Sequence, residues 1–132
     1  MQTIRVNARA VAVVTVPDRG SVNSWSSGSA LTDARGARVG TGHAYCVASP
    51  RRLTPRAKPV DLAQGRTPLH ICVESFQLRD GQITAQGEVL IGGVRTMPVV
   101  GGTGAYAGAF GTLRTTATRN GQQEIVIRVA TR

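Results

Sequence analysis

The sequence is poor in aromatic residues, with one Trp, two Tyr and two Phe among its 132 residues. Proteins that bind nucleic acid commonly combine positive charge with aromatic stacking platforms or a basic helix. This chain has a formal net charge of +9, but its fifteen arginines are scattered along candidate strands and Lys58 is its single lysine. We therefore expect no nucleic-acid partner. A generally cationic surface, or attraction of an anionic substrate or partner, accounts for the charge.

Long hydrophobic runs are also missing, and no apolar stretch approaches the roughly 20 residues that span a bilayer. The first residues, MQTIRVNARAVAVVTV, contain only a short apolar core, and the following Pro17-Asp18-Arg19 does not resemble a signal-peptide cleavage site. We expect no membrane partner, and we interpret this segment as part of the mature domain, with the cytoplasm as the expected location.

Cysteine and histidine are scarce. Cys46 and Cys72 have no zinc-ligand spacing, and His43 and His70 are too few to complete such a site. We therefore expect no metal and no cofactor. Without an export signal the thiols are expected to be reduced and buried, although the sequence does not decide whether the two cysteines are bonded.

Strand patterns dominate what is present, because Val, Ile and Thr are abundant and no window has the apolar spacing of an amphipathic helix. The Ser-rich segment 21–30 is expected to be irregular, and residues 49–70, which hold four of the six prolines, to form a long exposed loop. Closure into a barrel would remove exposed sheet edges. We predict one all-β domain over residues 1–132, an eight-stranded antiparallel up-and-down β-barrel with a central apolar cavity. Strands are expected over 3–16, 38–49, 70–79, 82–91, 95–100, 109–118 and 124–132.

The clearest element is a hairpin around Asp80-Gly81, since this dipeptide between alternating runs is a strong turn signal. A two-residue turn would pair Leu78 with Ile83 and place Glu74 on the inner face. Glu74 is then the only acid expected inside, either paired with an inward arginine or acting as an orienting group or general acid. The predicted inner face comprises His70, Cys72, Glu74, Phe76, Leu78, Ile83, Ala85, Gly87, Val89 and Ile91.

A glycine-rich stretch, VVGGTGAYAGAFGTLRT, covers residues 99–115. Its segment 102–107 fits the loose dinucleotide pattern G-x-G-x-x-A, but that pattern must open a helix whose N-terminus holds the pyrophosphate. The following residues are broken by Gly111 and rich in β-branched side chains, which disfavour a helix. Glycine also permits sharp bends at the end of a barrel. We therefore interpret the stretch as a barrel corner, with Tyr106 as a structural plug.

Three segments, VGTGHAYCV, SFQLRDGQITAQG and PVVGGTGAYAGAFGTLR, together resemble the allene oxide cyclase/dirigent superfamily of calycin-like β-barrels. The resemblance covers roughly residues 31–118. It implies an eight-stranded barrel with an apolar cavity and a homo-oligomer, either a dimer or a trimer.

Three activities are known on barrels of this family. In the alignment with plant allene oxide cyclases, Val13 and Thr15 replace the acid and the asparagine of those enzymes, and Cys46 matches a cavity cysteine. Dirigent proteins are secreted and use cavity aspartates, whereas this chain has no aspartate before Asp18. The resemblance is best to small bacterial cyclases that fold linear polyketide-type intermediates, including by Diels–Alder-like cycloaddition. We expect such a cyclase or, as an alternative, a barrel that only binds a hydrophobic small molecule.

The candidate site residues follow from the expected faces of the strands. Glu74 and Arg114 are the candidate catalytic residues. Arg114 lies inside if Asn120-Gly121 is a two-residue turn and outside if the register slips by one. Trp25 could close the cavity mouth or anchor a loop, and His43 and Tyr45 are expected to face outward and to suit an oligomer contact. The candidate substrate-binding residues are Trp25, Cys46, Cys72, Phe76, Met97 and Phe110, for which core packing is the alternative role.

Overall fold

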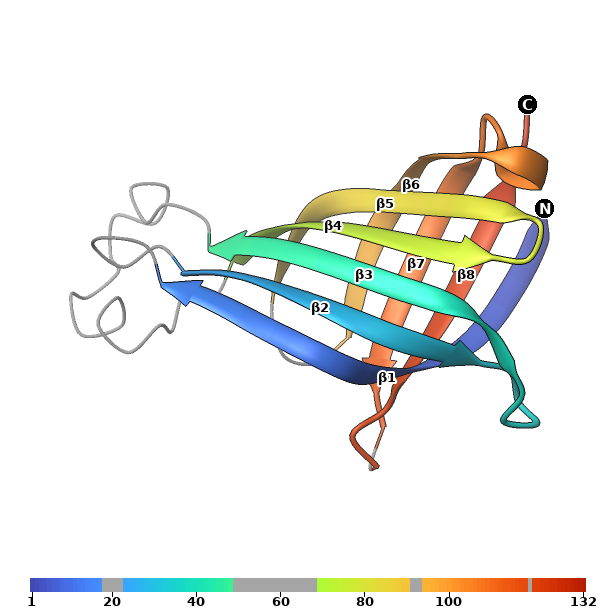
Figure 1. Ribbon diagram of the computed structural model, residues 1–132. Helices are drawn as coiled ribbons and strands as arrows, with labels where there is room; N and C mark the ends of the chain where they lie inside the picture. The colour runs from blue at the N-terminus through green and yellow to red at the C-terminus, as the bar shows by residue number, and fades with distance from the viewer. Residues whose placement is uncertain (18–22, 49–68, 91–93, 119) are drawn as a thin grey trace.

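The computed structural model describes residues 1–17, 23–48, 69–90, 94–118 and 120–132. Within these residues, eight strands form a closed barrel in sequence order, each antiparallel to its neighbours, with β1 paired to β8 (Figure 1). The predicted fold class is confirmed. The strands are β1 (Gln2–Pro17), β2 (Asn23–Thr32), β3 (Arg38–Ala48), β4 (Leu69–Leu78), β5 (Gly81–Leu90), β6 (Arg95–Gly102), β7 (Phe110–Ala117) and β8 (Gln123–Ala130).

The Ser-rich segment around Trp25 forms strand β2, so the expectation of an irregular segment at 21–30 was wrong. Serine and glycine have little intrinsic strand preference, but β2 is hydrogen-bonded on both sides, to β1 and to β3. Pairing on two edges outweighs the weak local propensity. The long loop predicted over 49–70 lies almost entirely outside the described residues, and β4 begins at Leu69.

The hairpin of β4 and β5 differs from the predicted register by two residues. Leu78 lies opposite Gly81 and Phe76 opposite Ile83, so the two turn residues are Arg79 and Asp80. A shift of two residues preserves which side chains face inward, because side chains alternate with a period of two. Eight of the ten predicted inner residues of this hairpin are accordingly buried; Gly87 is half-buried and Ile91 lies outside the described residues.

The register of β7 against β8 places Arg114 and Phe110 on the outer surface. Arg114 lies opposite Val126, and Thr118 donates its backbone N–H to the Gln122 carbonyl, so the connecting loop has three residues instead of two. This slip of one residue turns Leu113 inward and Arg114 outward. Arg114 and Phe110 do share one face, as predicted, but it is the outer one. Phe110 therefore does not line the cavity.

The glycine stretch is a barrel corner. Strand β6 ends at Gly102, one turn of 3-10 helix, η2 (Gly104–Tyr106), follows, and β7 begins at Phe110. In Figure 1 this corner lies at the same end of the barrel as both termini. Tyr106 is buried within the hydrophobic core, which agrees with its expected role as a plug. No helix that could hold a pyrophosphate follows in the described part of this segment.

The corner packs directly against the turn between β4 and β5. Thr103 donates its backbone N–H to the Gln82 carbonyl at 2.8 Å, and Ala105 donates to the Asp80 carbonyl at 2.9 Å. Gly104 has a φ of +60°, and a Cβ there would collide with the Asp80 carbonyl oxygen. The glycine-rich stretch and the Asp80-Gly81 turn therefore form the two halves of one joint at this end of the barrel.

We expect Gly104→Ala to lower the free energy of unfolding by about 1–3 kcal/mol. The alanine would have to adopt a positive φ, and its Cβ would collide with the Asp80 carbonyl oxygen. Chemical denaturation measures this loss. Gly101→Ala is the matched control: Gly101 has no positive φ, and a Cβ there meets no atom within 4 Å. The control should change the free energy of unfolding by less than about 0.5 kcal/mol. Equal losses in both variants would contradict this account of the joint.

The barrel interior holds a hydrophobic core of buried side chains. All eight strands contribute apolar side chains to this core. Among the described residues, no helix is long and apolar enough to cross a membrane. The largest fully buried apolar side chains are Leu31, Ile83, Met97, Leu113, Ile127 and Val129.

Candidate functional site

A cavity of about 190 Å³ opens inside the barrel near the turn between β7 and β8. Strands β1, β2 and β3 contribute Trp25, His43 and six small residues to its wall. Small side chains pointing into the lumen leave space that larger ones would fill. The small wall residues are Ala8, Ala10, Ser27, Ser29, Gly42 and Ala44.

The lining is mixed, whereas a purely apolar cavity was expected. Phe76 and Ile125 provide apolar surface, but Arg95 and Gln123 also line the cavity together with two serines. Such a cavity combines hydrophobic contact with a few groups that can orient a polar atom of a ligand, which is the usual composition of a small-molecule site.

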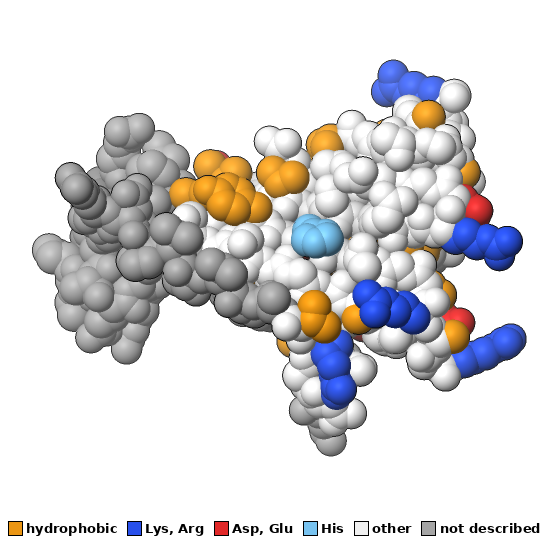
Figure 2. All heavy atoms as spheres, in the orientation of Figure 1, with side chains coloured by type: hydrophobic (Ala, Val, Ile, Leu, Met, Phe, Trp, Pro, Cys, Tyr) orange, Lys and Arg blue, Asp and Glu red, His pale blue; other side chains and the backbone are white. Residues whose placement is uncertain are grey.

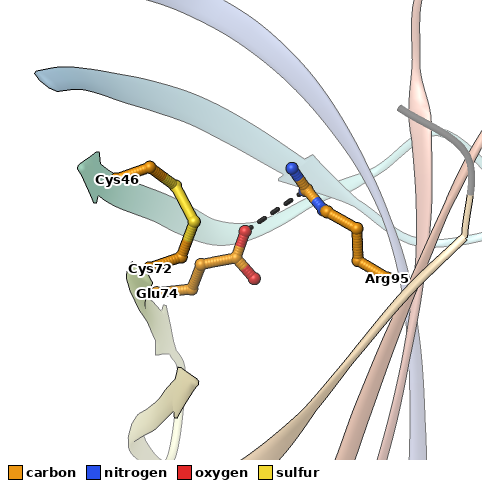
Figure 3. Close-up of a disulfide and its surroundings, with 4 residues drawn as sticks. All are labelled: Cys46, Cys72, Glu74 and Arg95. Atoms are coloured by element: carbon orange, nitrogen blue, oxygen red, sulfur yellow. Dashed lines mark hydrogen bonds and ion pairs between the residues drawn. A yellow bond between two sulfur atoms is a disulfide. The ribbon is translucent and has the colours of Figure 1, made fainter. Parts of the chain in front are cut away.

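A buried ion pair lies inside the barrel (Figure 3), and one of its two members, Arg95, lines the cavity. Arg95, the first residue of β6, donates from Nη2 to Oε1 of Glu74 on β4 at 3.3 Å. Both residues are almost fully buried, with exposed fractions of 8% for Arg95 and 5% for Glu74. Glu74 faces inward, as predicted, and an inward arginine pairs with it. That arginine is Arg95 and not Arg114.

The carboxyl group of Glu74 is in an environment that favours its neutral form. Burial raises its pKa above the usual value, and the positive charge of Arg95 opposes this shift only in part. Its second oxygen, Oε2, has no hydrogen-bond partner among the described residues. A buried carboxylate oxygen without a partner is energetically costly, and this cost is smaller when the carboxyl group is neutral.

Two further buried polar atoms inside the barrel lack a partner among the described residues, His70 Nδ1 and Thr115 Oγ1. Thr115 on β7 lies directly opposite Arg95 on β6. His70 lies on the inner face of β4, and burial lowers its pKa. Buried polar groups therefore lie on the inner faces of both β4 and β7.

Cys46 on β3 and Cys72 on β4 are direct cross-strand partners and form a disulfide (Figure 3). The expectation of reduced thiols was wrong. The register places two inward cysteines opposite each other with Cα atoms 4.1 Å apart, and this close approach lets the sulfur atoms bond. Disulfides are typical of oxidising compartments, so this bond does not favour the cytoplasmic location, which stays a prediction.

The remaining predicted site residues divide between the two faces. Trp25 is half-buried and lines the cavity, Phe76 is buried and also lines it, and Met97 is fully buried inside the barrel. Val13 and Thr15 lie in β1, and their side chains are outside what the structure describes. Cys46 and Cys72 are buried in the core beside the lumen.

His43 and Tyr45 are exposed on the outer face of β3, as predicted. Figure 2 shows hydrophobic side chains gathered over β3 and β4 on this face. Tyr45, Ile71 and Val73 are the exposed apolar residues there, with exposed fractions of 52%, 42% and 36%. These side chains suit a contact between copies of the chain, and the homo-oligomer stays a prediction.

Sequence reasoning missed Arg95, although a signal was present. In the segment RTMPVV, Met97 was expected inside, and alternation then places Arg95 and Val99 on the same inner face. The small side chains of β1 and β2 were also missed, because β2 was expected to be irregular.

A model of the "Allene oxide cyclase barrel like domain" family matches residues 63–129. This match spans half of the chain and agrees with the eight-stranded closed barrel. The chain belongs to the allene oxide cyclase-like family. Among curated proteins, no sequence matches the chain.

Solved structures with the same fold carry several activities. A pyocyanin demethylase is similar with a TM-score of 0.78 and 19% identity, over 98% of this chain and 100% of that one. A pterocarpan synthase dirigent protein has a TM-score of 0.69 and 15% identity, over 97% and 83% of the two chains. AbnU, an exo-specific intermolecular Diels-Alderase, has a TM-score of 0.68 and 18% identity, over 97% and 96%. At these identities, the allene oxide cyclase-like barrel is shared, and the reaction is not determined.

Proposed function

We propose that this allene oxide cyclase-like barrel is a cofactor-independent cyclase or isomerase of natural-product biosynthesis. It would fold a linear, hydrophobic, polyketide-type intermediate in the lumen for ring closure, including by Diels–Alder-like cycloaddition. The observation that carries the proposal is the lumen cavity lined by Arg95, whose guanidinium is held by the buried Glu74. Diels-Alderases and a dirigent protein among the similar structures support this class of chemistry.

The cavity volume limits how much of a substrate is enclosed. An apolar cavity of about 150 Å³ holds one benzene molecule, so about 190 Å³ accommodates one ring-sized part of a ligand. The part of the substrate that forms the ring would lie in the cavity, while the rest of the substrate extends through the cavity opening. Holding the two reacting ends together in this way removes most of the entropic cost of ring closure.

Arg95 and Glu74 would supply the polar part of the chemistry. The Arg95 guanidinium lines the cavity and can donate to a carbonyl oxygen of the substrate, which polarises the dienophile and stabilises developing negative charge. Glu74 holds the guanidinium in place and would act on the substrate through Arg95, as a positioning residue. Neither role consumes a co-reactant.

A second candidate function is binding of a hydrophobic small molecule without conversion. The small cavity and the structural value of a buried ion pair favour it, because such a pair can tie β4 to β6 without any chemistry. The two functions differ in one measurable result. A cyclase releases an isomer of unchanged mass and altered chromatographic retention, whereas a binding protein returns the compound unaltered.

Trp25 is the only tryptophan and lines the cavity, so its fluorescence reports on occupancy. We expect saturable quenching by cyclohexenone, a single ring with a carbonyl group, and at least about a tenfold loss of affinity in Ser27→Leu, which fills the lumen. Ser26→Leu is the matched control, because Ser26 is the adjacent, exposed residue. It should bind as the unmodified protein does, and both variants should melt cooperatively.

The same pair of variants tests the reaction. A linear conjugated polyene ketone incubated with the unmodified protein should give an isomer of identical mass, more slowly with Ser27→Leu than with Ser26→Leu. Saturable quenching without isomer formation from a set of such ketones would favour the binding function. Absence of saturable quenching, or equal quenching in both variants, would contradict a ligand in the lumen.

A further inference from the structure

The outer surface of the barrel carries a second hollow, of about 420 Å³, on the side formed by β6, β7, β8 and β1. We call it the arginine hollow. Its lining is almost entirely arginine and threonine, and none of the lining residues is aromatic. The arginines and threonines are Arg5, Arg114, Arg128, Thr96, Thr112 and Thr116.

The strand register explains why three arginines surround one point. Val126 on β8 lies directly between Arg114 on β7 and Arg5 on β1, and Arg128 follows two residues later on the same face. Neighbouring strands are about 4.8 Å apart, so Arg5 and Arg114 begin about 10 Å from each other across Val126. The short Val126 side chain forms the floor, and the longer arginines form the rim.

The charge of the arginine hollow is only partly balanced. Glu124 is the single acid in its lining, and it contacts Arg5 at 3.8 Å. Both side chains are more than half exposed, so this ion pair is weak. Among the residues that the structure describes, Arg114 and Arg128 make no salt bridge. Two exposed guanidinium groups on one concave surface therefore remain without an anionic partner.

We propose that the arginine hollow binds a small, multiply charged phosphate compound. Guanidinium groups match phosphate oxygens with paired hydrogen bonds, and threonine hydroxyls can donate to the remaining oxygens. A concave site of this size suits a compact anion. The absence of an aromatic lining residue disfavours single-stranded nucleic acid, which needs stacking platforms.

This site is separate from the lumen. On the same strands, Leu113, Thr115, Ile125 and Ile127 point inward and are buried, whereas the residues of the arginine hollow lie on the opposite face. Binding in the arginine hollow therefore does not depend on the function proposed for the lumen. Part of the net charge of +9 would then serve to attract the anionic ligand.

Inorganic pyrophosphate is the probe, with binding measured by isothermal titration calorimetry at low ionic strength. We expect a Kd of about 1 mM or tighter. Arg114→Gln and Arg128→Gln should each weaken binding by about tenfold, because each removes charge-assisted hydrogen bonds. Arg38→Gln is the control, since it removes one equally exposed arginine at the start of β3, and it should leave the Kd unchanged.

A variant that binds pyrophosphate more tightly cannot be explained by a folding defect, whereas a weaker binder could be. Glu124→Gln removes the only acid in the lining and should tighten pyrophosphate binding about two- to fivefold. No binding by the unmodified protein would overturn the proposal. So would an equal loss in Arg38→Gln, which would indicate a diffuse charge effect. Binding of polyglutamate without displacement by pyrophosphate would show an acidic protein surface as the partner instead, and would also overturn it.

Discussion

Arg95→Met is expected to lower the free energy of unfolding by about 3–5 kcal/mol at pH 8, the largest effect of any single substitution considered for this barrel. Methionine keeps the apolar stem of the side chain and removes the guanidinium. Glu74 then stays buried with its carboxylate unpaired, and a buried charge without a partner is strongly destabilising. Denaturation by urea, followed by tryptophan fluorescence, measures the loss.

The loss should depend on pH in a defined direction. Burial alone raises the pKa of Glu74, and removing Arg95 removes the opposing effect, so the pKa rises further in the variant. The pKa of Glu74 is then higher in the folded protein than the value of 4.5 that it has in the unfolded chain. Such a group leaves the protein fully stable below pH 4.5, where it is neutral in both states. Stability falls as the pH rises towards the pKa of the folded protein, because the buried carboxyl group must then ionise. Arg95→Met should therefore be less destabilised at pH 5 than at pH 8.

Two controls define the result. Arg114→Met removes an exposed arginine from the outer face of β7 and should change the free energy of unfolding by less than about 0.5 kcal/mol. The double variant Glu74→Leu and Arg95→Met replaces both partners by apolar groups and should recover much of the loss at pH 8. A pH-independent loss in Arg95→Met, or no recovery in the double variant, would contradict the buried pair.

Reduction of the Cys46–Cys72 disulfide is expected to have the second largest effect. The bond joins residues 26 positions apart, and the loop-entropy relation gives about 3–4 kcal/mol for a loop of that length. The free energy of unfolding should fall by this amount in dithiothreitol. The mechanism is chiefly a gain in freedom of the unfolded chain, so the barrel itself should keep its strand content, as measured by circular dichroism.

The matched control is the double variant Cys46→Ala and Cys72→Ala. Without reductant it should resemble the reduced protein, and dithiothreitol should not destabilise it further. A mass shift of two hydrogens on reduction confirms that the bond was present. Equal stability of oxidised and reduced protein would show that the bond contributes nothing to the fold.

Strand faces were predictable from the sequence wherever alternation was strong. The inner faces of β4 and β5, including Glu74, were predicted correctly even though the turn position was wrong, because a shift of two residues preserves the face. The barrel and its glycine corner were also predictable, since the spacing of turns and the family motifs pointed to the same architecture.

The remaining features depend on distances that no local pattern encodes. One extra residue between Thr118 and Gln122 was enough to turn Arg114 and Phe110 outward. The disulfide depends on the register across a connection of twenty residues, and the Glu74–Arg95 pair depends on two strands that are not neighbours. Side-chain alternation identifies the face of a residue, but only the closed barrel decides which residues meet across the lumen.

The joint between the two glycine-containing turns and the small-residue wall of the lumen cavity occupy different parts of the sequence. The family match covers residues 63–129, which include both turns, whereas the small side chains that shape the lumen cavity lie between Ala8 and Ala44. The matched segment therefore contains all four residues that make the two backbone hydrogen bonds of the joint. The small wall residues of the first three strands lie outside this matched segment, so their exchange would reshape the cavity without altering the backbone contacts that close this end of the barrel.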